Sequence, residues 1–230
     1  MLKLIKLIKL IRLIHLINKL SIKPSDTKRV FQIVDYILST SSKKRLAKIN
    51  IKLNTNPDYI EFRKNLQANP DLRNHLNLEP LSQLPKNSFG YSIYNYYTIN
   101  NLNPSYYRII NNQEPVYLIR NYLARTHDIW HLVSGFGNSS MEEYGLQAFY
   151  LGQEASMTAF CIMSAGFIEC LKSGKANTIV TYMDNVTRGY TLGKQAKKMI
   201  YLDWSRFYNL PFRDVQSSIL NYGSPQHIGV

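Results

Sequence analysis

Residues 117–171 decide the fold of this chain, and they read YLIRNYLARTHDIWHLVSGFGNSSMEEYGLQAFYLGQEASMTAFCIMSAGFIECL. Apolar residues recur at helical spacing through the first fifteen positions, and the glycine-containing loop that begins at Gly135 ends that helix. Ser139 or Ser140 is a suitable N-cap for a second helix, which we expect to run without a break to about Leu171. This second helix is apolar around most of its circumference and rich in glycine and alanine, which predicts a central helix packed on several sides.

Helical patterns also account for most of the chain on either side of this stretch. Apolar residues fall on one helix face between Lys23 and about Leu53, and two Asn-Pro-Asp turns then punctuate the chain. No run of alternating polar and apolar residues indicates a β-strand. The predicted fold class is therefore all-α, with a single multi-helix domain over residues 23–230. The turns lie at 56–58 and 69–71, and the last two predicted helices at 176–201 and 211–220.

The composition is that of a globular protein with a basic first quarter. The 230 residues are 45% hydrophobic, which allows a large core, and the net charge is +13. Residues 1–52 hold 13 of the 28 Lys and Arg residues and only two acidic ones, so the rest of the chain is nearly neutral. Cys161 and Cys170 lie on opposite faces of one predicted helix, and we expect both to be buried and reduced.

Residues 1–22 form a low-complexity leader in which a polar residue recurs at every third position. Because an α-helix repeats every 3.6 residues, this polar stripe winds around a helix instead of holding one face. Four cations interrupt the first dozen residues and no long apolar run remains, so the leader predicts neither a transmembrane helix nor a signal peptide. A disordered leader and a basic, apolar anchor on an anionic membrane surface both stay open, and the apolar residues favour a membrane over nucleic acid. In either case we expect the fold to survive removal of the first 20 residues.

The segment 125–131, RTHDIWH, carries the residues that predict chemistry. His127 and His131 are four residues apart, so their imidazoles lie on one face of a helix. Asp128 is about 100° around the helix from His127, so all three side chains can converge on one point. Two imidazoles and a carboxylate suit zinc, iron or manganese. The histidine pair can also be an ordinary helix pair, and a fourth ligand must come from another part of the chain.

The following helix opens with two glutamates that each have a structural explanation. Ser139 with Glu142, and Ser140 with Glu143, both have the spacing of a capping box. One glutamate can cap the helix while the other binds a metal. Glu154 comes eleven residues after Glu143 and returns to the same face after about three turns. A carboxylate in so apolar a helix predicts a proton relay, a partner of the metal ligands or half of an ion pair with an arginine.

The motif of His127-Asp-Ile-Trp-His131, followed by eleven residues and Glu143, resembles the metal motif of the coenzyme Q biosynthesis protein 4 family. The Leu-Pro and Phe-Gly pairs of residues 84–90 are similar to a family element ahead of that motif. The resemblance covers about residues 25–222 and leaves the leader out.

The resemblance implies an all-helical peripheral membrane protein of ubiquinone biosynthesis, with a hydrophobic channel for a polyprenyl tail. It implies a divalent metal ion, with zinc as the first expectation and magnesium, manganese or iron as alternatives. The implied location is the cytoplasmic side of a prokaryotic membrane, or the matrix side of the inner membrane in a mitochondrion. The expected partners are a prenylated lipid or prenyl phosphate, the membrane surface, other quinone biosynthesis enzymes and a second copy of the chain, but no nucleic acid. The implied metal ligands are His127, Asp128, His131 and Glu143.

Two functions follow from the resemblance. The first is an enzyme, a metal-dependent decarboxylase and hydroxylase that removes the ring carboxyl group of a prenylated benzoate oxidatively. Asp128 or Glu154 would then relay protons, and Arg120 and Arg125 would hold an anionic head group. The second is a non-catalytic isoprenoid-lipid-binding scaffold for a quinone biosynthesis complex.

A third function comes from the His-Asp pair alone. An HD-type metal phosphohydrolase carries such a pair, together with a histidine upstream and an aspartate downstream. His75 and Asp184 are available for these two positions.

Overall fold

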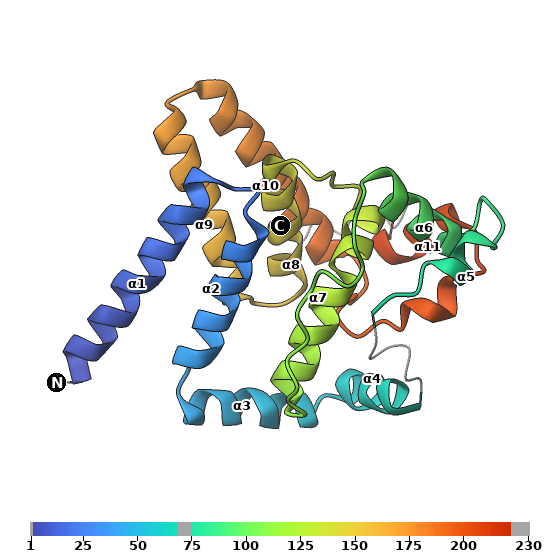
Figure 1. Ribbon diagram of the computed structural model, residues 1–230, viewed down its shortest axis with the longest axis horizontal. Helices are drawn as coiled ribbons and strands as arrows, with labels where there is room; N and C mark the ends of the chain where they lie inside the picture. The colour runs from blue at the N-terminus through green and yellow to red at the C-terminus, as the bar shows by residue number, and fades with distance from the viewer. Residues whose placement is uncertain (1, 69–74, 222–230) are drawn as a thin grey trace, which may run out of the picture. The chain divides into compact units, whose positions relative to one another are not determined.

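The computed structural model describes residues 2–68 and 75–221, and its regular structure is helical (Figure 1). Within these residues the only β-type pairing is an isolated bridge between Ser88 and Pro211. The all-α prediction is therefore confirmed, whereas the turn predicted at 69–71 lies outside the described residues. The elements are α1 (Leu2–Ile22), α2 (Thr27–Thr40), α3 (Lys43–Asn54), α4 (Pro57–Ala68), α5 (Glu79–Ser82), α6 (Phe89–Ile99), α7 (Pro115–Ser134), α8 (Ser140–Gln153), α9 (Met157–Ser173), α10 (Ala176–Gln195), the 3-10 helix η2 (Trp204–Phe207) and α11 (Phe212–Leu220).

Contacts divide the described chain into two compact units, and each unit is made of two segments. Unit 1 contains the residues up to Lys43 together with Phe136–Gln195, and so α1, α2, α8, α9 and α10. Unit 2 contains Lys44–Gly135 together with the residues from Ala196 onward, and so most of α3, α4 to α7, η2 and α11.

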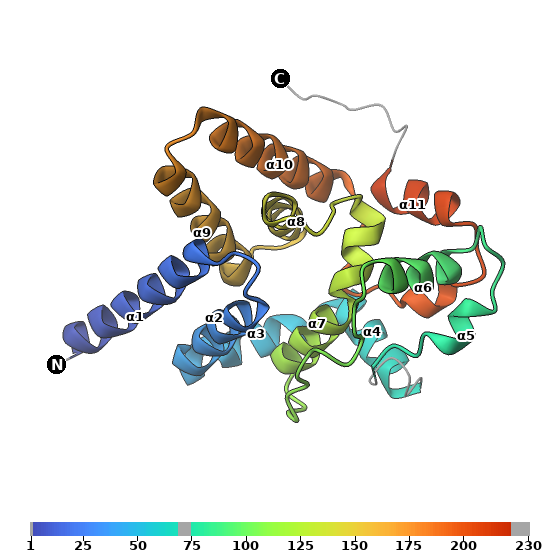
Figure 2. The ribbon, with the colours of Figure 1, turned by 45° about the horizontal axis from the view of Figure 1, so that its top comes forward.

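Helix α8 is central in unit 1, where α9 and α10 both pack against it (Figure 2). It meets α10 at glycines: a Cβ atom on Gly189 would lie 1.9 Å from the carbonyl oxygen of Gly145. A Cβ atom on Gly193 would lie 2.3 Å from the carbonyl oxygen of Phe149. The backbones of the two helices therefore touch directly, which only glycine permits. Gly145, one of the small residues of the predicted central helix, therefore allows α8 and α10 to pack closely.

The predicted single helix from 139 to 171 is wrong, because the chain forms two helices there. Glu154 has an extended backbone (φ −159°, ψ 146°), and the hydroxyl of Ser156 caps α9 by accepting a hydrogen bond from the N–H of Ala159 at 3.2 Å. Helical spacing of apolar residues continues across the break, so Ser156 was the signal that could have revealed it. Glu154 is exposed at this break, and the three-turn argument that placed it on the face of Glu143 no longer holds.

Helix α9 carries both cysteines. Cys161 and Cys170 are free and buried, as predicted. Burial raises the pKa of both thiols, so neither is activated as a nucleophile.

The leader is a helix, α1, over its described length, so the alternative of a disordered leader is wrong. Its second half belongs to the core of unit 1, where Ile17 and Leu20 are 8% and 1% exposed and pack in one cluster with Ile33 of α2. Removal of the first 20 residues would delete these core side chains, which contradicts the expectation that the fold survives it. None of the described helices, α1 included, is long and apolar enough to cross a membrane.

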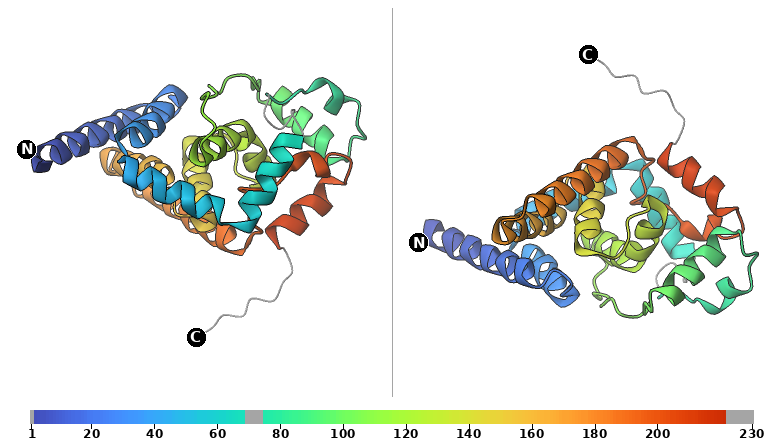
Figure 3. Two further views of the ribbon diagram at one scale, coloured as in Figure 1. Left: turned by 90° about the horizontal axis from the view of Figure 1, so that it is seen from below. Right: turned by 90° about the horizontal axis from the view of Figure 1, so that it is seen from above.

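The first half of α1 extends past the other helices of its unit (Figure 3). Because its polar residues wind around the helix, leucines and isoleucines are exposed on several sides of it. Two bonds tie this half to α2: Tyr36 donates a hydrogen bond to the carbonyl of Lys9 at 3.0 Å, and the Lys9 ammonium donates to the carbonyl of Thr40 at 3.3 Å. The exposed apolar residues are Leu4, Ile5, Leu7, Ile8, Leu10, Ile11 and Ile14.

Helix α7 belongs to unit 2 and packs against α6 and α11. Its Tyr122 ring meets Phe62 of α4 edge-on, with 4.7 Å between the ring centroids. Pro115 begins the helix, two residues before the predicted start at Tyr117, and Gly135 ends it in the left-handed conformation (φ 69°), at the predicted loop. Buried side chains recur along α7 up to Ser134, so the helix is fixed over its whole length.

Candidate metal centre

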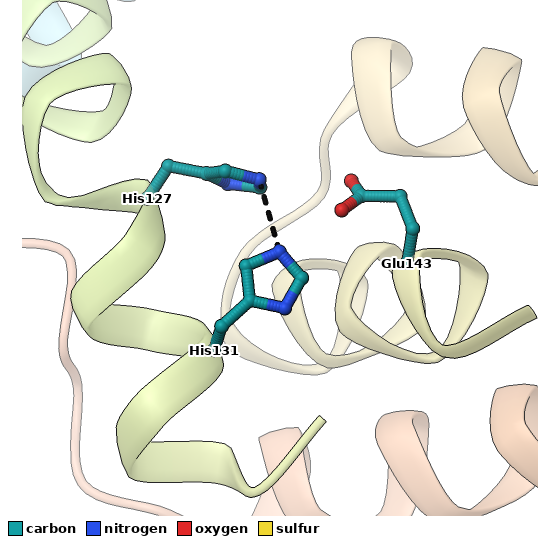
Figure 4. A group of neighbouring side chains, drawn as sticks. All are labelled: His127, His131 and Glu143. Carbon is teal, nitrogen blue, oxygen red and sulfur yellow. Dashed lines mark hydrogen bonds between the residues drawn. The ribbon is translucent and has the colours of Figure 1, made fainter. Parts of the chain in front are cut away.

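Two imidazoles meet on the last two turns of α7. The Nε2 atoms of His127 and His131 lie 3.3 Å apart, and the rings are nearly perpendicular (85°) (Figure 4). His131 is buried and His127 is partly buried. The two rings lie on one helix face, as their spacing of four residues predicts.

The distance between the two nitrogens suits a shared cation. Two nitrogens that each lie about 2.05 Å from a tetrahedral zinc ion are about 3.3 Å apart. Without a cation, the N–H group of one imidazole would donate a hydrogen bond to the nitrogen of the other ring, which must then be neutral. The pair is therefore already at the spacing of two metal ligands.

Asp128 is buried beside the histidines, and its carboxylate has partners of its own within unit 2. The hydroxyl of Tyr107 donates a hydrogen bond to its Oδ1 atom at 3.3 Å, and the Tyr107 ring also lies edge-on to His127. Burial and, after it, the negative charge of Asp128 raise the pKa of Tyr97. Two tyrosines thus surround the carboxylate that the sequence predicts as a ligand.

Ser139 and Glu142 form the capping box of α8, and Ser140 and Glu143 do not. The Ser139 hydroxyl accepts a hydrogen bond from the Glu142 N–H at 3.3 Å and donates one to the Glu142 carboxylate at 2.7 Å. The bond from Ser139, which is the largest cause, lowers the pKa of Glu142. Of the two predicted capping boxes, the first is confirmed and the second is wrong.

Glu143 has a different partner, one turn further along α8. The side-chain amide of Gln147 donates a hydrogen bond to Oε1 of Glu143 at 2.6 Å. Gln147 is buried and Glu143 is partly buried. Because Glu142 caps the helix, the carboxylate of Glu143 is not required for capping.

Figure 4 draws the three candidate metal ligands found among the described residues, of which His127 and His131 belong to unit 2 and Glu143 to unit 1. Asp128 is not a member of this group, and neither is the exposed Glu154. The donor set of two imidazoles and one carboxylate fits zinc and other divalent ions of the first transition row.

The two residues that an HD-type phosphohydrolase would add are not in this group either. His75 lies with its Nδ1 atom 3.1 Å from the carbonyl oxygen of Pro104, and Asp184 is exposed on α10. The structure therefore offers no support for that third function.

The two arginines predicted to hold a head group have different surroundings. Arg120 donates hydrogen bonds to the carbonyl of Arg108 and to the side chain of Asn121, so it braces the loop ahead of α7. Arg125 is buried, and its guanidinium lies 5.9 Å from the ring centre of Tyr122. Burial lowers the pKa of Arg125 to about 10, which still leaves it a cation at neutral pH.

Sequence reasoning missed Tyr107. It lies in an irregular loop, twenty-one residues ahead of the aspartate to which it donates a hydrogen bond. No helical spacing links these two positions, so only the folded chain brings them together.

The family model described as coenzyme Q (ubiquinone) biosynthesis protein Coq4 matches residues 12–220. The chain belongs to the Coq4 family. Its biological context is therefore ubiquinone biosynthesis, and the match includes every candidate site residue from Arg120 to Glu154. The first turns of α1 precede the matched range.

The Coq4 chain also has the fold of a solved protein. The crystal structure of a protein from Nostoc punctiforme that is named for ubiquinone biosynthesis has a TM-score of 0.73 and 22% sequence identity. That similarity covers 93% of this chain and 97% of the Nostoc chain, and at this identity it concerns the fold. No curated protein matches the chain.

Proposed function

We propose that this Coq4 protein binds a divalent metal ion, zinc first, through His127, His131 and Glu143. The observation that carries the proposal is the 3.3 Å distance between the two Nε2 atoms, which suits two ligands of one ion. Further support comes from the sequence, in which eleven residues separate His131 from Glu143, as in the metal motif that the chain resembles. Asp128, the fourth residue of the motif, would join them if its carboxylate turned away from Tyr107.

We propose further that the substrate is a prenylated aromatic acid and that its ring carboxyl group is replaced by a hydroxyl group. Carbon dioxide leaves, dioxygen supplies the hydroxyl oxygen, and a two-electron donor reduces the second oxygen atom to water. When bound, the metal ion supplies a Lewis acid that lowers the energy of negative charge on the substrate's oxygens.

The residues of the chain then have separate tasks. The buried carboxylate of Asp128, with a tyrosine hydroxyl on Oδ1, is the group we propose for proton transfer. The buried cation of Arg125 is the group we propose for holding the acidic head of the substrate. Arg120 is bonded to the loop at Arg108, so we assign it a part in ordering that loop.

Family membership also leaves a scaffold role open, in which a metal ion and a prenyl lipid are bound but no reaction occurs. Both roles need a surface where the lipid is found. We propose that the first half of α1 lies on an anionic membrane, because it combines exposed leucines and isoleucines with Lys6, Lys9 and Arg12 and has no acidic residue. Other enzymes of the pathway and a second copy of the chain remain proposed partners.

One preparation tests the enzyme against the scaffold. The purified protein is loaded with zinc and mixed with a prenylated hydroxybenzoate, dioxygen and a reductant, and the products are followed by mass spectrometry. Loss of carbon dioxide with gain of one oxygen supports the enzyme. Tight retention of the unchanged lipid by the metal-loaded protein supports the scaffold. Absence of both metal and lipid from the protein would overturn the proposal.

A further inference from the structure

We infer that Gln147 is a positioning residue that holds the carboxylate of Glu143 for metal binding. This inference rests on the proposed metal site and adds to it a residue that does not touch the ion. Its basis is a contact within a single helix of unit 1.

The contact is short and its direction is fixed by chemistry. Nε2 of Gln147 lies 2.6 Å from Oε1 of Glu143, one turn earlier on α8. An ionised carboxylate only accepts hydrogen bonds, so the amide must present its nitrogen to Glu143 and not its oxygen. Gln147 is 6% exposed, and water therefore cannot easily take its place.

A glutamate side chain has three rotatable bonds, and it loses this freedom when it becomes a ligand. A partner that already fixes one carboxylate oxygen reduces that loss and keeps the second oxygen in a defined direction. Ligating carboxylates in metal sites are usually held by hydrogen bonds of this kind. The Gln147 amide supplies one without adding a charge that would compete with the metal.

A buried glutamine can also serve stability alone, and α8 contains such a residue for comparison. Gln153 is 2% exposed and donates a hydrogen bond to the carbonyl oxygen of Gly193 at 2.8 Å, which joins α8 to α10. Its bond leads to backbone and not to a candidate ligand. Gln153 is therefore the matched control for Gln147.

The test measures zinc affinity by chelator competition and the melting temperature of the metal-free protein. We expect Gln147→Leu to weaken zinc binding about 10- to 100-fold. Gln147→Glu, which keeps the shape but donates no hydrogen bond when ionised, should weaken it at least as much and serves if the leucine variant does not fold. Gln153→Leu should lower the melting temperature and leave zinc affinity unchanged.

Zinc affinity within twofold of the wild type in both Gln147 variants would overturn the inference, with the metal site itself intact. A wild-type protein that binds no zinc would overturn the proposed function, and the inference with it. A red-shifted or weakened visible spectrum of the cobalt-substituted Gln147→Leu variant would support an altered ligand geometry. An identical spectrum together with identical affinity would leave Gln147 a structural residue like Gln153.

Discussion

Ser139 and Glu142 bond each other reciprocally at the start of α8. The hydroxyl of Ser139 accepts from the Glu142 N–H at 3.3 Å and donates to Oε2 of the same residue at 2.7 Å. A further hydrogen bond from the Gly137 N–H to Oε1, at 3.1 Å, engages the second carboxylate oxygen. Helix capping is thereby assigned to one of two adjacent glutamates, and Glu143 lies about 100° further around the helix.

The proposed ligands differ from this capping pair in their expected effect on metal content. We expect His131→Ala to abolish stoichiometric zinc, and Glu143→Ala to weaken zinc binding by more than the roughly 10- to 100-fold that outer residues contribute. Elemental analysis of dialysed protein measures the first effect, and chelator competition measures the second. Glu142→Ala is the control, and it should keep its zinc. Unchanged zinc in both ligand variants would remove the site.

The capping box predicts a loss of stability and a dependence on pH. Ser139→Ala should lower the free energy of unfolding by about 1 kcal/mol, since the first turn of α8 loses its side-chain acceptor. The folded protein holds the pKa of Glu142 below its ordinary value of 4.5, so this carboxylate stabilises the fold above that value. The contribution is lost as the pH falls through the lowered pKa.

Urea unfolding of the wild type and of Glu142→Gln at several pH values measures this contribution. The difference between the two proteins should be full near pH 7 and should shrink below about pH 4. A difference that stays constant down to pH 2 would contradict an ionic role for Glu142.

The direct contact of α8 and α10 predicts that one methyl group added at Gly189 destabilises the fold. Gly189→Ala places a Cβ atom 1.9 Å from the carbonyl oxygen of Gly145, and the backbones must separate to admit it. We expect a loss of at least about 1–3 kcal/mol in the free energy of unfolding, the usual cost of overpacking. Thr187→Ala, at an exposed position of the same helix, should change it by less than about 0.5 kcal/mol. Equal stability of the two variants would refute the close contact.

The exposed half of α1 predicts membrane binding that can be removed without unfolding. Leu4, Ile5 and Ile8 are 60%, 47% and 56% exposed, so their replacement by serine should leave the melting temperature nearly unchanged. Each buried methylene contributes about 0.8 kcal/mol, and the triple variant should bind anionic phospholipid vesicles at least about tenfold more weakly. Co-sedimentation with vesicles measures this.

Ile99→Ser is the control for the anchor, because Ile99 is 72% exposed on α6 of unit 2. It should bind vesicles as the wild type does. If the triple variant and the control bind equally well, α1 is not the anchor.

The sequence by itself determined what depends on neighbours within one helix. The spacing of His127 and His131 put both rings on one face, Gly135 marked the end of α7, and the pair Ser139 and Ser140 marked the start of α8. These features follow from the 3.6-residue repeat and from the N–H and C=O groups at a helix end that have no partner within the helix. Both effects involve residues only a few positions apart.

Only the tertiary structure decided what depends on distant segments. The apolar pattern runs through Glu154 although the chain bends there, because the packing of α8 and α9 within unit 1 overrides local periodicity. Leu20 of the low-complexity leader is a core residue because Ile33 and side chains of α9 pack in one buried cluster with it. The hydroxyl of Tyr107 reaches Asp128 from an irregular loop, and no repeat in the sequence encodes that distance.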